Sequence, residues 1–305
     1  MKPLIFVVGP TAVGKSDFAL QAATRFKGVI LNCDSVQTYA HVQIGAAKPD
    51  MATRAKVPHH MLDFVLPPHQ LTAAEFRREA LDQLEVLTAN HTVFAVGGSG
   101  FYLRALQKGL YPMTKVPKER TVYWQARLDQ EGSIKLHQEL EKVDAAYAKK
   151  LSPNDGYRIL RALETIENEG RSITDIQAEF AKNHTPLPYR TLKIGFELPR
   201  EELRKRIELR TQTMISAGLR QEVEGLIRKG LQSWAPLKSV GYKEMVDGIL
   251  SGASDQEIAQ QITLSTAQLA KKQMTWFRGD KEINWFASGN WQKPLDFVSD
   301  FLAED

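Results

Sequence analysis

The feature that most constrains the fold of this chain is a glycine-rich loop, GPTAVGKS, at residues 9–16. It fits the pattern G-x-x-x-x-G-K-[ST], whose backbone N–H groups surround phosphate oxygens. An apolar run, Leu4–Val8, precedes the loop, and a segment of helical periodicity, Ser16–Phe26, follows it. Because the motif requires a strand before it and a helix after it, this context predicts an α/β fold with a site for a di- or triphosphate.

Each residue of this phosphate loop is a candidate ligand for the phosphates. Its glycines let N–H groups turn inward, and the start of the following helix contributes about half a positive charge. Lys15 adds a full positive charge, and the Ser16 hydroxyl is placed to hold Mg²⁺. The motif does not specify ATP. The expected diphosphate-binding residues are Gly9, Pro10, Thr11, Ala12, Val13, Gly14, Lys15 and Ser16.

Further apolar runs predict a parallel sheet around this loop. Residues 29–31 are apolar, as are the last four residues of the segment 92–96, and a helical pattern at Thr72–Leu87 lies between them. Continuously apolar strands separated by helices are typical of a parallel sheet that helices cover on both faces. Leu192–Phe196 is expected to rejoin the sheet, and the chain from Arg200 onward is expected to be helical.

Between these parts the sequence is helical and polar, without a convincing strand. One helix there is expected to begin with Ser152 as its cap and to end before Gly170. We therefore expect a P-loop NTPase-like core, a parallel sheet flanked by helices, formed by residues 1–113 and 190–305. Residues 114–189 are expected to form an all-helical insertion domain.

Two of the predicted strands end in segments that suit the approach of a ligand. Asp34 follows the strand at 29–31, and the glycine-rich segment Gly97–Gly100 follows the strand at 92–96. Ligands gather at the carboxyl ends of parallel strands, so both segments are expected to face the phosphate loop. For Asp34 three roles are open: a carboxylate near magnesium, a general base, or a cap for the next helix.

Composition narrows the class of protein. Apolar residues make up 43% and charged residues 25%, which excludes disordered, collagen-like and coiled-coil chains. The single cysteine, Cys33, excludes an internal disulfide and a thiolate metal cage, and it favours a reducing cytoplasm. The apolar runs are too short for a signal peptide or a membrane span. The net charge of +4 is small, so binding of nucleic acid would require local clusters of basic residues.

A helix predicted at Ile258–Phe277 carries one such cluster. Helical geometry separates an apolar stripe, expected to be buried, from a basic face, which by itself is typical of a solvated surface. The stripe comprises Ile262, Leu269 and Trp276, and the opposite face comprises Lys271, Thr275 and Arg278.

The adjacent His59 and His60 are expected to form hydrogen bonds within the core rather than to bind zinc. Residues 288–305 carry no informative pattern.

Eight short motifs occur in an order that resembles one known family. They are GPTAVGKS, DSVQTY (34–39), IGAAKP (44–49), PHH (58–60), GGSGFYLRAL (97–106), SPNDGYRILRALE (152–164), GYKE (241–244) and KKQMTWFR (271–278). Together, from residue 4 to about residue 280, the chain resembles the bacterial tRNA dimethylallyltransferases, also called tRNA isopentenyltransferases. The resemblance implies transfer of the dimethylallyl group from dimethylallyl diphosphate to N6 of the adenosine 3′ to the anticodon, with Mg²⁺ as cofactor.

The resemblance also implies roles for individual residues. Asp34 would be the general base, Thr11 and Lys15 would lie at the diphosphate, Ser16 near Mg²⁺, and Arg210 would clamp the leaving group. The insertion domain would contact the anticodon arm. The residues expected to contact tRNA are Asp34, Ser35, Val36, Gln37, Ser99, Arg158, Arg161, Gly241, Tyr242, Lys243, Lys271, Lys272, Gln273, Thr275, Trp276 and Arg278.

Two other functions share some of these features. An ATP-dependent small-molecule or nucleoside kinase would use the same loop, but no basic lid with arginines for a γ-phosphate is identifiable. A non-catalytic tRNA-binding protein or GTPase-like switch is the second, although the guanine-reading N-K-x-D motif is absent. The partners we expect are tRNA, through its anticodon stem-loop, and dimethylallyl diphosphate. No membrane partner is expected, and the chain is expected to act as a cytoplasmic monomer.

Overall fold

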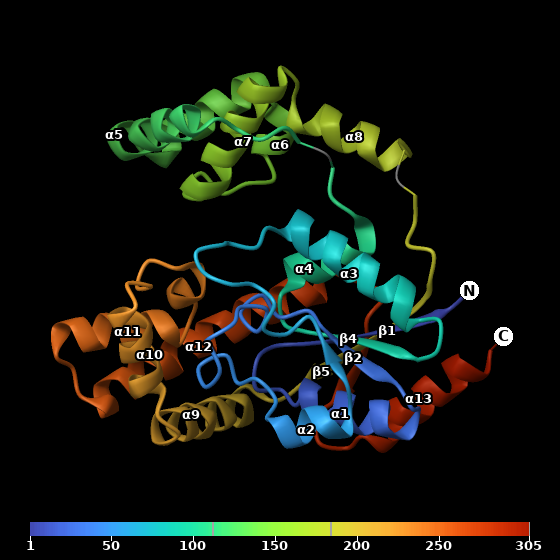
Figure 1. The fold of residues 1–305 in the computed structure, drawn as a ribbon. Helices are drawn as coiled ribbons and strands as arrows, with labels where there is room; N and C mark the ends of the chain where they lie inside the picture. The colour runs from blue at the N-terminus through green and yellow to red at the C-terminus, as the bar shows by residue number, and fades with distance from the viewer. Residues whose placement is uncertain (112, 184, 305) are drawn as a thin grey trace. The chain divides into compact units, whose positions relative to one another are not determined.

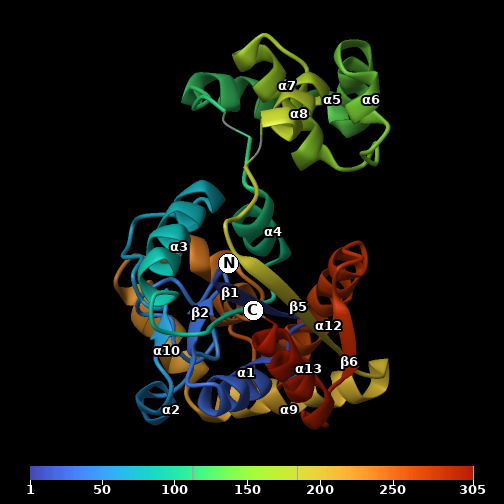
Figure 2. The same ribbon diagram turned by 90° about the vertical axis from the view of Figure 1, so that its right-hand side faces the viewer.

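The computed structural model describes residues 1–111, 113–183 and 185–304 of the chain. They form two compact units, one of Met1–Gln107 with Leu187–Asp305 and the other of Lys108–Pro186. The division expected from the sequence placed the two junctions after residues 113 and 189. Figures 1 and 2 trace both units from two directions.

The larger unit is built on one parallel sheet (Figure 1). Its strand order is β3-β2-β4-β1-β5-β6, and each neighbouring pair runs parallel. Helices flank the sheet, so the expected P-loop-like α/β architecture is confirmed. The strands are β1 (Pro3–Val8), β2 (Val29–Asn32), β3 (His59–His60), β4 (Val93–Val96), β5 (Arg190–Glu197) and β6 (Asn284–Ala287).

Two edge strands were not predicted from the sequence. β3 has only two residues, His59 and His60, so it has no apolar run that could mark it. β6 pairs with β5 at the opposite edge, and its residues are partly or fully exposed, so its sequence lacks the continuous apolar character of a central strand. The expectation that the chain is helical from Arg200 onward is therefore wrong at β6.

The helices of the larger unit cover both faces of the sheet. Leu4 and Phe6 of β1 pack with α3 and α4 in one layer, whereas Ile5 and Val7 pack with α1 and α13 in the other. This alternation follows from the two-residue period of a strand, and Figure 1 shows the two layers on opposite sides of the sheet. The helices are α1 (Lys15–Arg25), α2 (Met51–Lys56), α3 (Ala73–Leu87), α4 (Gly100–Lys108), α9 (Arg200–Ser216), α10 (Leu219–Arg228), α11 (Tyr242–Ser251), α12 (Asp255–Arg278) and α13 (Gln292–Ala303).

The buried face of α12 differs from the expected stripe. Its buried residues are Ile258, Ile262, Ala270 and Phe277. Leu269 is only half-buried, and Trp276 remains 39% exposed. Phe277 takes the place expected for Trp276 because the last turn of α12 enters the layer formed with β1, α3 and α4. The indole of Trp276 instead lies against Gly100, whose missing side chain leaves room for it.

The smaller unit contains four helices among its described residues and no strand: α5 (Lys118–Val143), α6 (Ala145–Ala148), α7 (Gly156–Glu169) and α8 (Ile173–Asn183). The expected start of α7 at Ser152 is wrong. Asp155 is the cap, since its side chain accepts a hydrogen bond from the backbone N–H of Arg158, whereas the Ser152 hydroxyl accepts one within the preceding turn. Ile159 and Leu163 are buried, and Gly170 ends the helix, as predicted.

No helix in the described part of the chain is long and apolar enough to cross a bilayer.

Candidate functional site

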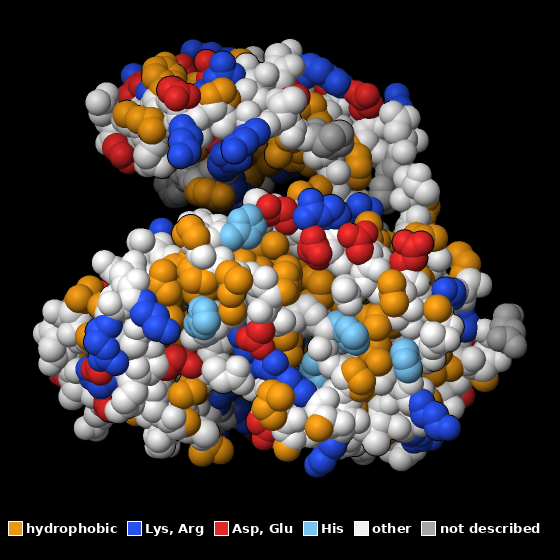
Figure 3. All heavy atoms as spheres, in the orientation of Figure 1, with side chains coloured by type: hydrophobic (Ala, Val, Ile, Leu, Met, Phe, Trp, Pro, Cys, Tyr) orange, Lys and Arg blue, Asp and Glu red, His pale blue; other side chains and the backbone are white. Residues whose placement is uncertain are grey.

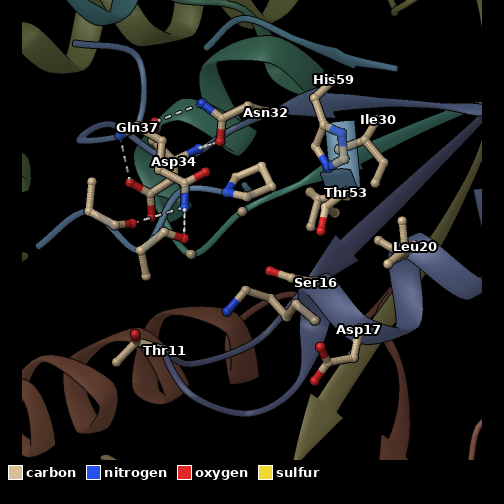
Figure 4. A pocket seen from close by; sticks show the side chains of 18 of the residues that line it. Thr11, Ser16, Asp17, Leu20, Ile30, Asn32, Asp34, Gln37, Thr53 and His59 are labelled. Carbon is tan, nitrogen blue, oxygen red and sulfur yellow. Dashed lines mark hydrogen bonds between the residues drawn. The ribbon is translucent and has the colours of Figure 1, made fainter. Parts of the chain in front are cut away.

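The site forms where three adjacent strands end. Because β2, β4 and β1 are neighbours and parallel, the segments that follow them meet at one edge of the sheet. A cavity at this edge is lined by residues of all three segments and by α9 and α12 (Figure 4). In the space-filling view, acidic and basic side chains lie together in a hollow on one face of the larger unit (Figure 3). The lining includes all four predicted catalytic residues, Thr11, Lys15, Asp34 and Arg210, together with Ser16, Gln37, Gly97, Gly98 and Gln273.

The phosphate loop has the conformation expected of an anion cradle. Gly9 and Gly14 have φ angles of 136° and 98°, and Ala12 also adopts a positive φ, 62°. A Cβ at Gly9 would lie 2.7 Å from the carbonyl oxygen of Phe196, so only glycine fits there without displacing β5. No side chain caps the start of α1 at Gly14, and its first N–H groups therefore remain available to an anion.

Two cations line the cavity near one carboxylate. The ammonium of Lys15 donates a hydrogen bond to the carbonyl oxygen of Pro10, 2.6 Å away. Burial lowers the pKa of Lys15 to about 7; the nearby Asp34 opposes this shift, and Arg210 adds to it. Burial also lowers the pKa of Arg210, again opposed by Asp34. The site is thus rich in partly desolvated positive charge, which suits a polyphosphate ligand.

The position of Asp34 is compatible with two of the roles considered from the sequence. Its Oδ1 accepts hydrogen bonds from the backbone N–H groups of Val36, at 2.8 Å, and Gln37, at 3.3 Å. This oxygen caps the turn that follows β2. No side chain or backbone donor in the described residues binds Oδ2, so this oxygen can accept a proton from a ligand in the cavity. The capping and general-base roles are therefore compatible.

Gln273 of α12 links the phosphate loop to the end of β4. Its Oε1 accepts a hydrogen bond from the backbone N–H of Thr11 at 2.8 Å, and its Nε2 donates to the carbonyl oxygen of Gly98 at 2.9 Å. Gln273 was grouped with residues that contact tRNA, but both ends of its amide bind the walls of the cavity. The sequence carried no signal for this role, because Gln273 and the phosphate loop are far apart along the chain.

The C-terminal segment supports the phosphate loop from its outer side. The Ser288 hydroxyl donates to the carbonyl oxygen of Val13, and Trp291 packs against Phe18 and Phe196 with ring centroids 5.8 and 5.0 Å apart. A Cβ on Gly14 would lie 3.0 Å from the Ser288 oxygen and 3.1 Å from the Trp291 ring. Residues 288–305 carried no interpretable pattern, yet part of this segment determines the shape of the loop.

Some residues expected to contact tRNA are buried or form hydrogen bonds within the protein. Tyr242 is fully buried, and its hydroxyl donates to Glu222 at 2.6 Å, so its side chain is unable to reach an RNA ligand. The hydroxyl of Ser99 accepts a hydrogen bond from the backbone N–H of Ser35 and donates to the Ser35 hydroxyl, which joins the ends of β4 and β2. Gly241 is buried, although it lines a second lobe of the cavity with Thr11, Asp34, Val36 and Arg210.

Other predicted tRNA contacts are on the surface. Lys243, Lys271, Lys272 and Thr275 are exposed, as is Arg278, which lies 3.5 Å from Glu197. In the smaller unit, Arg158 is exposed and lies 3.4 Å from Asp155. Arg161 is held by the fully buried carboxylate of Glu164, so part of its charge is compensated within the unit.

The donors near the phosphate loop fit a magnesium ion bound together with a diphosphate. Mg²⁺ is usually held by one or two side chains, substrate phosphates and water rather than by a protein cage. The cavity supplies the hydroxyl of Ser16 and the carboxylate of Asp17. Within the described residues, no cluster of three or more His, Cys, Asp or Glu residues could hold a metal ion without the ligand.

These features define a class of protein: an α/β group-transfer enzyme whose phosphate loop binds a di- or triphosphate opposite a carboxylate. The IPP transferase family model matches residues 37–280, and the chain belongs to this family. A relative from Bdellovibrio bacteriovorus, named tRNA dimethylallyltransferase, is 49% identical over 94% of each chain. One from Geotalea uraniireducens, named tRNA dimethylallyltransferase 2, is 41% identical over 92% of this chain and 91% of its own. The structure of the Bacillus halodurans tRNA isopentenylpyrophosphate transferase is similar, with a TM-score of 0.72, 28% identity and coverage of 99% and 96% of the two chains.

Replacing Gly14 with alanine is expected to weaken pyrophosphate binding by about tenfold or more, because a side chain at this φ is strained and would press on Ser288 and Trp291. Isothermal titration with inorganic pyrophosphate and Mg²⁺ measures the effect. Gly230→Ala is a matched control, since Gly230 also has a positive φ, 73°, but no atom within 4 Å of an added Cβ. Equal affinities for the two variants would contradict the role assigned to Gly14.

The low pKa of Lys15 predicts that pyrophosphate affinity falls as the pH rises above 7. Below about pH 7 the ammonium is charged before the anion arrives, whereas above it the free protein must take up a proton on binding. Titration at pH 8 in two buffers of different ionisation enthalpy measures this uptake. Lys15→Arg, which stays charged, should lose the uptake that the native protein shows; the same proton uptake in both proteins would assign it elsewhere.

Proposed function

We propose that this protein is a tRNA dimethylallyltransferase, which moves the dimethylallyl group from dimethylallyl diphosphate to N6 of the adenosine 3′ to the anticodon. The observation that carries the proposal is that Asp34 has a carboxylate oxygen open to the same cavity that contains Lys15 and Arg210. A base thus lies beside an anion site, as alkyl transfer to an amine requires. The two relatives described above support this chemistry by their names and their coverage of nearly the whole chain.

The positive wall of the cavity stabilises the leaving group. Breaking the bond between carbon and oxygen in an allylic diphosphate transfers negative charge to the departing diphosphate. Lys15, Arg210 and the N–H groups of the phosphate loop are fixed where this charge develops. One preorganised donor of this kind typically contributes about 3 kcal/mol to transition-state stabilisation. Thr11 lines the same wall, where its hydroxyl can bind a phosphate oxygen.

Asp34 acts as the general base that assists the attack of the acceptor amine on the dimethylallyl carbon. The exocyclic amine of adenine is a poor nucleophile, because its lone pair is delocalised into the ring. As the C–N bond forms, the open oxygen of Asp34 takes one proton from this amine. General-base assistance of this kind typically gives about 10²–10⁴-fold in rate. The cap formed by Oδ1 holds the carboxylate in place during the transfer.

The proposed reaction uses a magnesium ion bound beside the phosphate loop. When bound, the ion neutralises negative charge on the diphosphate. The residues that would hold it are Ser16, at the first turn of α1, and the carboxylate of Asp17. Ser16 is exposed to the cavity, so its hydroxyl requires no rearrangement to reach a ligand.

The tRNA is bound by surfaces of both units. The target base must leave the stack of the anticodon loop to reach Asp34, which costs a few kcal/mol and is easiest in a single-stranded loop. Exposed Lys271 and Lys272 on α12 supply phosphate contacts, and Trp276 offers an exposed aromatic surface on the same helix. In the smaller unit, Arg158 and the partly compensated Arg161 are assigned to the anticodon arm.

The direct test is incubation of the purified protein with dimethylallyl diphosphate, Mg²⁺ and unmodified tRNA, followed by mass spectrometry of the nucleosides. The expected product is N6-(dimethylallyl)adenosine, with diphosphate released in equal amount. A parallel reaction with ATP in place of dimethylallyl diphosphate distinguishes a kinase. Consumption of ATP without any prenylated nucleoside would reject the proposed function.

Replacing Asp34 with asparagine is expected to lower kcat by about 10²–10⁴-fold, because asparagine retains a cap for the turn but no longer accepts the proton. Affinities for pyrophosphate and for tRNA should stay within a few-fold of native. Single-turnover transfer and filter binding measure the two effects. Native turnover in Asp34→Asn would remove Asp34 from the role of base.

Replacing Lys271 and Lys272 together with alanine is expected to weaken tRNA binding and to reduce the slope of log K against log[salt] by about one to two units. Both lysines are exposed, and neither forms an ion pair with a described residue. The control replaces two other exposed lysines, Lys229 and Lys293, which changes the net charge equally. Identical salt slopes for the two double variants would show that this face of α12 is only solvated.

A further inference from the structure

Gln37 lies beside Asp34 in the cavity, and its amide has one possible orientation (Figure 4). Its Nε2 donates to the carbonyl oxygens of Ala46 and Ala47, at 3.0 and 3.2 Å. Carbonyl oxygens only accept hydrogen bonds, so the amide nitrogen, and not the amide oxygen, must face them. This contact fixes which end of the side chain is turned away from the loop.

The oxygen of the same amide is left without a protein partner. No N–H or O–H group of the described residues donates to Gln37 Oε1, whereas both hydrogens of Nε2 are directed at Ala46 and Ala47. The Gln37 side chain lines the cavity with Asp34. The side chain thus offers the cavity a hydrogen-bond acceptor of fixed identity, which is unable to act as a donor without losing two hydrogen bonds.

The loop that orients Gln37 is itself held from outside the cavity. Glu222 of α10 accepts hydrogen bonds from the backbone N–H groups of residues 43–45, between 2.8 and 3.3 Å. The buried Tyr242 donates its hydroxyl to Glu222 and accepts a hydrogen bond from the N–H of Ala46 at 3.2 Å. Gly45 permits this arrangement, since a Cβ there would lie 2.6 Å from the Tyr242 ring.

The chemistry of the proposed reaction calls for such an acceptor. The amine of adenine carries two hydrogens; one proton goes to Asp34 as the N6–C bond forms, and the C–O electron pair leaves with the diphosphate. The second hydrogen stays on N6 in the product. We propose that Gln37 Oε1 accepts this retained hydrogen, so that Gln37 selects a base with a 6-amino group and rejects one with a 6-carbonyl, whose oxygen would face another acceptor. Tyr242 and Glu222 act as positioning residues for Gln37. This inference rests on the proposed function and specifies how its acceptor base is chosen.

The test compares two synthetic anticodon stem-loops that differ only at the position 3′ to the anticodon, adenosine in one and inosine in the other. Dissociation constants are measured with pyrophosphate and Mg²⁺ present. The native protein should prefer the adenosine loop by about tenfold or more, because a site built for an amino hydrogen is poorly matched to a carbonyl. In Gln37→Leu, which keeps the size of the side chain, the preference should fall to about twofold or less, consistent with the loss of one hydrogen bond. Gln292→Leu, at an exposed glutamine of α13, should retain the native preference.

A second variant tests the support behind the loop. Tyr242→Phe removes the hydroxyl that joins Glu222 to Ala46 but keeps the buried ring. The preference for adenosine should fall several-fold while the affinity for pyrophosphate alone stays native, a split that general destabilisation would not produce. Undiminished preference in Tyr242→Phe would contradict the positioning role.

The outcomes separate this inference from the function on which it rests. If the native protein prenylates the adenosine loop but Gln37→Leu retains the native preference, or the native protein binds both loops equally, the assignment of Gln37 is wrong. If the native protein transfers no dimethylallyl group to the adenosine loop, the proposed function fails, and this inference fails with it.

Discussion

The site depends on positive charge that folding has partly removed from water. Burial lowers the pKa of both Lys15 and Arg210, and Asp34 is the carboxylate whose charge opposes the shift at each. One carboxylate offsets only part of the charge of two cations. In the proposed reaction a diphosphate supplies the remaining negative charge, so its binding would relieve an electrostatic cost already present in the free protein. The parallel order β2-β4-β1 makes this possible, since it places Asp34 beside the phosphate loop.

The walls of the cavity are held from behind by side chains of the C-terminal half of the chain. Gln273 binds Thr11, Ser288 binds Val13, and Glu222 binds the loop that contacts Gln37. Each of these contacts joins a segment of the N-terminal part of the chain to a residue that follows the helical insertion. Such support fixes the geometry of a site more firmly than loops could do alone. The segments on either side of the insertion therefore form one functional unit.

The sequence predicted the parts of the site in which local chemistry is distinctive. The phosphate loop, the strands around it and Asp34 could be identified because glycine spacing, continuous apolar runs and a carboxylate after a strand have direct physical meanings. Gln273 and Ser288 could not, since an amide or hydroxyl has the same appearance in sequence whether it faces solvent or binds a distant loop. The burial of Trp276 was mispredicted because periodicity finds a helical face, but only tertiary packing decides which neighbouring residue is buried. Tyr242 was assigned to tRNA through its motif alone, which does not reveal that its side chain is buried.

Ser288 and Trp291 contact Val13 and Gly14 of the phosphate loop, so the loop is complete only after a distant part of the chain has been synthesised. During translation the phosphate loop, residues 9–16, is synthesised before the residues that support it, 288–291. A nascent chain still lacking this segment holds the loop without its outer wall. The phosphate loop therefore gains its outer wall only after residues 288–291 have been synthesised and have folded onto it.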